Sequence, residues 1–385
     1  MKLSQDRILT THTGSLPRSA ELTELLIQQE QSVAIDEELL ASASAAGVAR
    51  VVQGQIEAGC DIINDGEQPR VGFQTYVPRR MTGFGGESKR PPVPDFVTFP
   101  QYGELVRSRG LRKAKIDSAP QAIAEVSYEG LSDARAEATM FADALADAPG
   151  EAAETFMTAA SPGIIAVTML NRYYASYEDY LYALAREMRT EYAFIVDQGY
   201  LLQLDCPDLA MERGRMFADK TLAEFRDAVA LHIDAINQAV EGIPADRIRL
   251  HCCWGNWDGP HIDDVDLGEI LPLLYEAKVG ALSIPFANPR HQHEYAILKE
   301  TPPPNTMALI AGVIDPTTNF VEHPEVVARR IAEAIDAVGD RERVLAGTDC
   351  GFGTFAGNDM VAGDVVWAKL ATLAEGAQLA SSRIW

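Results

Sequence analysis

The chain has 385 residues, of which 47% are hydrophobic, so it is long enough to bury a large core. Its formal net charge of −23 argues against nucleic acids and anionic membrane surfaces as partners, because both attract basic patches. The sequence has neither the ~20-residue apolar run of a membrane span nor a signal-peptide core. Five scattered cysteines do not make a disulfide framework, so we expect a protein of the reduced cytoplasm.

Short apolar runs followed by helical patterns recur along the first half of the chain. They predict strands over 8–11 and 60–64, and helices from near Ala20 and over 35–58. Residues 71–125 are irregular and rich in Gly, Pro, Arg and aromatics, and predict an insertion or arm (71–130 in all) with a small hairpin. The next elements predicted, in chain order, are helices over 131–147 and 151–160, a strand over 163–168 and a helix over 177–198.

The same alternation continues to the C-terminus. The predicted elements, in chain order, are a strand over 201–205, a helix over 221–241, strands over 247–250, 281–284 and 307–314, a helix over 323–338 and a strand over 343–348.

Eight alternating strand–helix units predict a single α/β domain over residues 1–385, a (β/α)8 TIM barrel with an insertion after the second strand. The alternative is an open, doubly wound sheet. That fold would favour a Gly-rich dinucleotide loop after the first strand, and His12-Thr13-Gly14-Ser15 lacks the G-x-G-x-x-G spacing. The barrel predicts that the polar residues following each strand meet at one mouth.

A His and two Cys follow the fifth and eighth predicted strands. His251 and Cys253 project to the same side, because side chains alternate along a strand, whereas Cys252 points into the barrel wall. In a barrel, Cys350 after the last strand reaches the same place. Free Cys can be an ordinary core residue, but three N and S ligands with one open position are typical of catalytic zinc.

Zinc held by two thiolates and an imidazole is formally neutral, so it is a poor Lewis acid for hydrolysis. It is well suited to deprotonating an incoming thiol while leaving the sulfur nucleophilic. The ligand set therefore predicts alkyl transfer to sulfur.

The chain resembles the catalytic C-terminal barrel of the cobalamin-independent methionine synthases and their short single-barrel relatives, over nearly its whole length. The marks are motifs that follow the strands, specific only in combination: 10–17 (TTHTGSLP), 65–67 (DGE), 167–171 (VTMLN), 204–207 (LDCP), 251–253 (HCC) and 349–351 (DCG).

The resemblance implies roles for the residues in these motifs. It implies a Zn²⁺ cofactor on His251, Cys253 and Cys350. It implies that Gly14 and Ser15 hold the carboxylate of an amino-acid thiol. It also implies that Glu67 and Asp205 bind the ammonium group of that thiol.

Three departures from the family pattern bear on substrate and metal. Pro285 stands where the family has a fourth zinc ligand, a Glu. We favour an open position there over substitution by His291, His293 or Glu294.

The family's proton-shuttling His is missing after the seventh strand. Asp315 remains at that place. We predict Asp315 and Glu67 as the catalytic residues. Asn171 and Arg172 are predicted to bind substrate, although Arg172 replaces an aromatic residue that stacks on folate. Its guanidinium would suit an anionic group.

These observations favour a zinc-dependent S-methyltransferase that transfers a methyl group from a donor such as 5-methyltetrahydrofolate to a homocysteine-like thiol. The first alternative is addition of a thiol to an epoxide, as in epoxyalkane:coenzyme M transferases. The second is a metal-free lyase like uroporphyrinogen decarboxylase, and the last is a non-enzymatic zinc or thiol carrier. The expected partners are a small thiol and an alkyl donor, and a homo-oligomer is compatible with the sequence.

Overall fold

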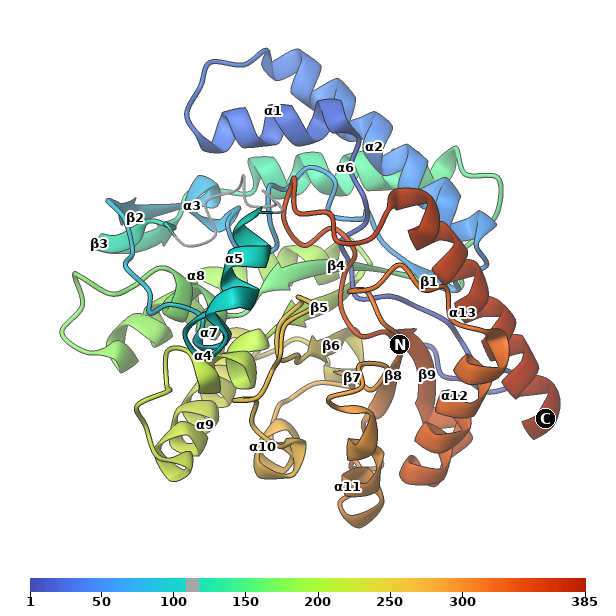
Figure 1. Ribbon diagram of the computed structural model, residues 1–385. Helices are drawn as coiled ribbons and strands as arrows, with labels where there is room; N and C mark the ends of the chain where they lie inside the picture. Colours follow the sequence, from blue (N-terminus) through green and yellow to red (C-terminus); the bar gives the residue numbers. More distant parts are fainter. Residues whose placement is uncertain (109–117) are drawn as a thin grey trace.

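The computed structural model describes residues 1–108 and 118–385 and is organised around a curled parallel sheet (Figure 1). The strands follow one another in space in chain order, as expected when each is joined to the next by an outer helix. The strands of this sheet are β1 (Ile62–Ile63), β4 (Glu154–Ala160), β5 (Leu201–Asp205), β6 (Ile248–His251), β7 (Ala281–Pro285), β8 (Ala308–Ile314) and β9 (Val344–Thr348).

A short N-terminal segment closes the ring between β1 and β9. Thr10 forms a parallel bridge to Ala346 of β9, and Thr11 forms one to Ile62 of β1. The Thr11 amide donates to the Ala346 carbonyl at 2.9 Å, and the Ile62 amide donates to the Thr10 carbonyl at 3.0 Å. This segment is the predicted first strand. Together with the seven strands of the sheet it makes eight, which confirms the (β/α)8 barrel.

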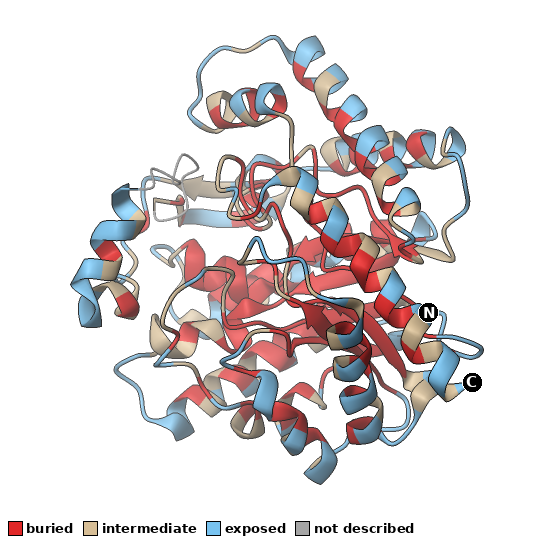
Figure 2. Cartoon of the chain, turned by 45° about the vertical axis from the view of Figure 1, so that its right-hand side comes forward, coloured by how far each residue is buried: buried red, intermediate tan, exposed pale blue. Residues whose placement is uncertain are grey.

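Helices pack around the outside of the barrel and bury their inner faces against it (Figure 2). The helices predicted over 35–58, 131–147, 177–198, 221–241 and 323–338 are confirmed to within three residues at each end. The helices outside the insertion are α1 (Ala20–Glu30), α2 (Glu37–Glu57), α6 (Ser132–Ala146), α7 (Pro162–Thr168), α8 (Tyr177–Asp197), α9 (Leu222–Ala239), α10 (Leu267–Leu274), α11 (Tyr295–Glu300), α12 (Pro324–Val338) and α13 (Gly363–Ile384). None of the described helices is long and apolar enough to cross a membrane.

The third strand was assigned wrongly. Residues 163–168 form helix α7, and the predicted helix over 151–160 is instead strand β4. A buried apolar run does not distinguish strand from helix by periodicity. The start signal decides: the Ser161 side chain caps α7 by accepting from the Ile164 amide, and Pro162 occupies the first helical turn.

The elements of the insertion after β1 lie near one another on one side of the barrel (left in Figure 1). Strands β2 (Met81–Gly85) and β3 (Gln121–Tyr128) pair antiparallel, as the predicted hairpin requires. Its helices are α3 (Val77–Arg80), α4 (Pro94–Thr98) and α5 (Pro100–Ser108), and we call α4 and α5 the helical arm. Residues 109–117 of the predicted insertion lie outside the described residues. The assignment of the chain to one domain stays a prediction.

Candidate active site

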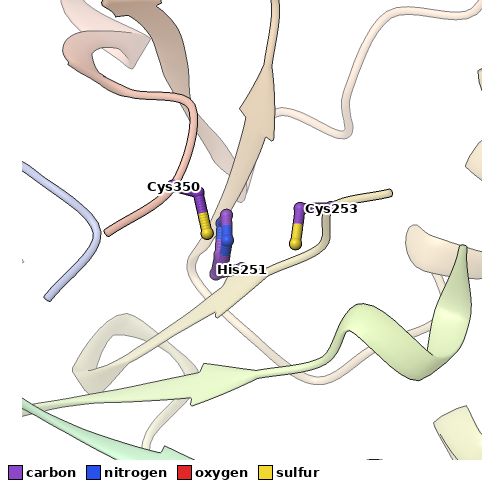
Figure 3. A group of neighbouring side chains, drawn as sticks. All are labelled: His251, Cys253 and Cys350. Carbon is purple, nitrogen blue, oxygen red and sulfur yellow. The ribbon is translucent and has the colours of Figure 1, made fainter. Parts of the chain in front are cut away.

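His251, Cys253 and Cys350 meet at the C-terminal end of the barrel. His251 ends β6, Cys253 follows two residues later, and Cys350 lies two residues beyond β9. One ligand atom from each residue lies within 4.8 Å of the other two. Figure 3 shows the three side chains projecting toward a common point from these separate segments. The structure therefore brings together residues that are nearly a hundred positions apart in the sequence.

The chemistry of these donors fits a metal ion such as zinc. His251 is 2% exposed, and neither ring nitrogen has a hydrogen-bond partner among the described residues. A hydrogen bond from the Cys350 thiol lowers the pKa of Cys253, and this same bond raises the pKa of Cys350. Without a cation the two sulfurs therefore share one proton, and a bound cation would allow both to ionise. Two sulfurs and an imidazole nitrogen are ligands that Zn²⁺ prefers.

Two buried carboxylates lie near this cluster. Asp205 ends β5 and is paired in register with His251 on β6. Glu67 accepts a hydrogen bond from the Thr158 hydroxyl at 3.0 Å, but its Oε2 has no partner within the described part of the chain. Burial, reinforced by the neighbouring Asp205, raises the pKa of Glu67 to about 8. Burial also raises the pKa of Asp205 to about 6. Such a pair favours a bound cation or a proton.

The turn after the first strand fits closely against Glu67. Gly14 has a φ of +150°, and a Cβ there would lie 2.6 Å from Oε1 of Glu67, so only glycine fits. Ser15 is buried beside Gly351, and its hydroxyl accepts from the Gly353 amide at 3.3 Å. The Gly-Ser motif thus lies between the acidic pair and the loop that carries Cys350.

A cavity of about 180 Å³ contains most of the predicted site. Its polar floor includes the metal-cluster residues and both carboxylates. The floor residues are Thr13, Ser15, Glu67, Asp205, His251, Cys253 and Cys350. The rest of the lining was not predicted, and we call its aromatic residues the outer wall. The rings of that wall are Phe73, Phe96, Tyr102, Trp257 and Phe355.

A smaller cavity of about 20 Å³ adjoins Cys253 and Cys350 and is also lined by Pro285 and Asp315. Pro285 is therefore close to the cluster, as predicted from its place at the end of β7. Asp315 lies near the cluster as well, where its carboxylate accepts from the amide and hydroxyl of Thr317 at 2.8 and 2.7 Å.

Of the three residues considered as substitutes for a fourth ligand, two are held by other contacts and one is exposed. Both ring nitrogens of His291 are hydrogen-bonded, to Asp264 at 2.9 Å and Glu294 at 2.8 Å. Burial lowers the pKa of His291, but these two hydrogen bonds outweigh it and raise that pKa to about 9. Glu294 also accepts from the Leu267 amide, and His293 is exposed. These contacts favour an open fourth position.

Asn171 and Arg172 are not among the described residues that line the larger cavity. The Asn171 carboxamide accepts from the amides of Tyr173 and Tyr174 and so stabilises its own turn. Arg172 is exposed, and its Nε donates to Gln121 at 3.3 Å. Their predicted role in substrate binding has no support from this placement.

Gln203 is a positioning residue that the sequence analysis missed. It lies on β5 two residues before Asp205, so both side chains project to the same side. Its amide nitrogen donates to Oδ1 of Asp205 at 2.8 Å and also to the Thr13 carbonyl. Side-chain alternation along β5, counted back from Asp205, was the signal that could have identified Gln203.

Comparisons with known proteins agree with this fold. The chain is 24% identical over 384 residues to a methionine synthase of Saccharolobus solfataricus, covering 96% of this chain and 94% of that protein. The structure of a B12-independent methionine synthase from Shewanella sp. W3-18-1 matches with a TM-score of 0.73 and 19% identity, over 98% of this chain and 99% of that chain. The chain is thus similar over nearly its whole length to a protein named methionine synthase, and it shares the fold of a B12-independent methionine synthase. No protein-family model matches it.

A second kind of relative matches only part of the chain. A 2-hydroxypropyl-CoM lyase of Xanthobacter autotrophicus is 31% identical over 144 residues. This match covers 31% of the chain and 38% of the lyase. The similarity to the methionine synthase therefore extends over nearly the whole chain, whereas the similarity to the lyase covers one segment.

Proposed function

We propose that the protein is a zinc-dependent methyltransferase of the cytoplasm that methylates a homocysteine-like thiol. The observation that carries this proposal is the convergence of His251, Cys253 and Cys350 at the floor of a cavity shared with two buried carboxylates. Full-length similarity to a methionine synthase supports it. So does the Shewanella relative, which was solved in complex with selenomethionine, an amino acid of the kind that the product would be.

Zinc held by these three residues would supply a Lewis acid that ionises the thiol at neutral pH. The protein's other residues hold the substrate. Glu67 and Asp205 bind the ammonium group, because two buried carboxylates with raised pKa values gain most from a cation. The Gly14-Ser15 turn binds the carboxylate through backbone and hydroxyl donors. These contacts orient the sulfur toward His251, Cys253 and Cys350.

The methyl transfer forms one bond and breaks another. A sulfur lone pair forms the new bond to the methyl carbon as the carbon–nitrogen bond of 5-methyltetrahydrofolate breaks. The leaving nitrogen keeps that electron pair and takes a proton. Asp315 lines the smaller cavity together with Cys253 and Cys350. We assign the proton transfer to Asp315 together with Glu67.

A second candidate is opening of an epoxide by a thiol such as coenzyme M. The partial match to the 2-hydroxypropyl-CoM lyase favours it. Coenzyme M carries a sulfonate and no ammonium group, so the acidic pair at Glu67 and Asp205 disfavours it.

Two measurements test the proposal. Elemental analysis should find about one zinc per wild-type chain and little in Cys350→Ala. Mixing the zinc-loaded protein with homocysteine in weak buffer should release a proton, whereas coenzyme M should release little. Absence of zinc in the wild type would contradict both thiol-transfer functions. Proton release by coenzyme M alone would favour the epoxide reaction.

A further inference from the structure

Residues 253–257, which we call the Cys253 loop, carry two tryptophans that the proposed reaction does not use. Trp254 is 2% exposed, and its Nε1 donates to the Val265 carbonyl at 2.7 Å. The Nε1 of Trp257 donates to Oδ2 of Asp95 in the helical arm at 3.3 Å. The polar edge of each indole is therefore tied to another part of the chain, and its flat faces remain for other contacts.

Each indole stacks on a buried histidine. The rings of Trp254 and His291 lie with their centroids 4.0 Å apart and an interplanar angle of 22°. The rings of Trp257 and His261 lie 4.3 Å apart at 21°. The two histidines also line the smaller cavity, which adjoins both thiols of the metal cluster. Two stacked pairs therefore hold the Cys253 loop beside the cluster.

Both imidazoles are protonated, because each ring nitrogen faces a hydrogen-bond acceptor. His291 is bound by Asp264 and Glu294. The Nδ1 of His261 lies 3.1 Å from Oδ2 of Asp264, and its Nε2 lies 3.1 Å from the Trp257 carbonyl. A neutral imidazole has one N–H, so only an imidazolium donates on both sides. Burial lowers the pKa of both rings, but their hydrogen bonds to Asp264 outweigh it and raise both values.

A single carboxylate joins the two cations. Oδ2 of Asp264 accepts from both imidazoliums, and the charge of Glu294 completes a neutral group of two cations and two anions. An imidazolium over an indole face gains from the ring's electron density as well as from stacking. Among the residues that the structure describes, the metal cluster is the only group with the spacing of metal ligands, so this charged group is not a second metal site.

We infer that Asp264, His261 and His291 form a clasp that positions Cys253 for the metal. They act through the two indoles, and Trp254 directly follows Cys253, so the clasp fixes the direction in which the Cys253 sulfur projects. A ligand that is already oriented binds with less loss of conformational freedom. This inference rests on the proposed zinc-dependent function and adds the positioning residues that prepare one of the ligands.

The test loads the full chain with Co²⁺ in place of zinc, because the absorption of cobalt–thiolate bonds reports how many sulfurs bind the metal. Asp264→Asn removes the charge that joins the two imidazoliums. The thiolate absorption per bound cobalt should fall to about half, because Cys253 no longer binds, and cobalt affinity should fall roughly tenfold. Asp263→Asn is the matched control, because Asp263 is adjacent and exposed, and it should match the wild type.

Denaturant unfolding of the same variants separates positioning from stability, since a loss of stability alone leaves the absorption per bound cobalt unchanged. His291→Gln removes one cation of the clasp and should lower that absorption as well, and it serves as the test if Asp264→Asn does not fold. Equal absorption per bound cobalt in these variants and the wild type would overturn the inference and leave the proposed metal site intact. A wild type without cobalt–thiolate absorption would overturn the proposed function and the clasp with it.

Discussion

The floor and the outer wall of the cavity are built in different ways. The floor residues follow strands of the barrel, where backbone pairing fixes them: Asp205 and His251 are register partners on adjacent strands. The wall comes largely from loops and the helical arm, whose attachment is a few side-chain hydrogen bonds. In this fold, residues at the strand ends usually carry out the reaction, and the loops usually select the substrate. Changes in the floor should therefore affect the reaction more severely than changes in the wall.

The largest effect is expected from the metal cluster. Cys253→Ala should lower zinc affinity by more than about 100-fold, which exceeds the effect of losing residues that only support ligands. Competition with a chromogenic chelator measures it. Cys60→Ala is the control, because Cys60 is also a buried thiol but lies outside the cluster. Equal zinc affinities in the two variants would exclude Cys253 as a ligand.

Glu67→Gln should weaken homocysteine binding by about 10- to 100-fold, because a hydrogen bond to a charged group is lost. Titration calorimetry measures the change. A thiol of the same length that lacks the amino group, 4-mercaptobutyrate, should bind wild type and variant alike. If both thiols lose affinity equally, Glu67 does not recognise the ammonium group.

The same substitution has a second consequence that depends on pH. The pKa of Glu67 is raised from 4.5 to about 8, so the folded protein keeps a proton that the unfolded chain releases. The stability from this group is fully present below pH 4.5 and is lost as pH rises through 8. Glu67→Gln should therefore raise the free energy of unfolding at pH 9 by on the order of 1–3 kcal/mol and change it little at pH 4. Denaturant unfolding at both pH values measures this, and a destabilised variant at pH 9 would contradict it.

Pro285→Glu is expected to have an intermediate effect. The new carboxylate would enter the smaller cavity beside Cys253 and Cys350 and supply a fourth ligand. Zinc affinity should rise by roughly tenfold, within the range of changes around a site, and the homocysteine-induced proton release should fall. Pro285→Ala, which removes the ring without adding a ligand, should leave zinc affinity unchanged. Equal affinities in both variants would show that this position does not reach the metal.

The smallest effect is expected where the arm meets its loop. Tyr102→Phe keeps the ring of the wall but removes its hydrogen bond to Asp258. A single such bond contributes about 1 kcal/mol, so tetrahydrofolate binding should weaken by less than about fivefold and zinc affinity should not change. A loss of zinc in Tyr102→Phe would mean that floor and wall do not behave as separate regions.

The sequence predicted the floor better than the wall for a physical reason. Strand alternation and the convergence of barrel strands brought His251, Cys253 and Cys350 together without knowledge of any contact. The same alternation applied to β5 would have added Gln203. The ring of Phe96 faces the cavity only because Asp95 is anchored to a loop 166 positions away, and no local pattern encodes that contact. The third strand was missed because a buried apolar run suits a helix equally well until Ser161-Pro162 is recognised as its start.

In the proposed reaction, a thiol substrate joins a zinc ion held by His251, Cys253 and Cys350. X-ray absorption at the zinc edge tests this directly, on the wild-type protein with and without homocysteine. We expect two sulfur ligands and one imidazole nitrogen in the free protein, and three sulfur ligands after homocysteine is added. An unchanged number of sulfur ligands after saturation with homocysteine would contradict it.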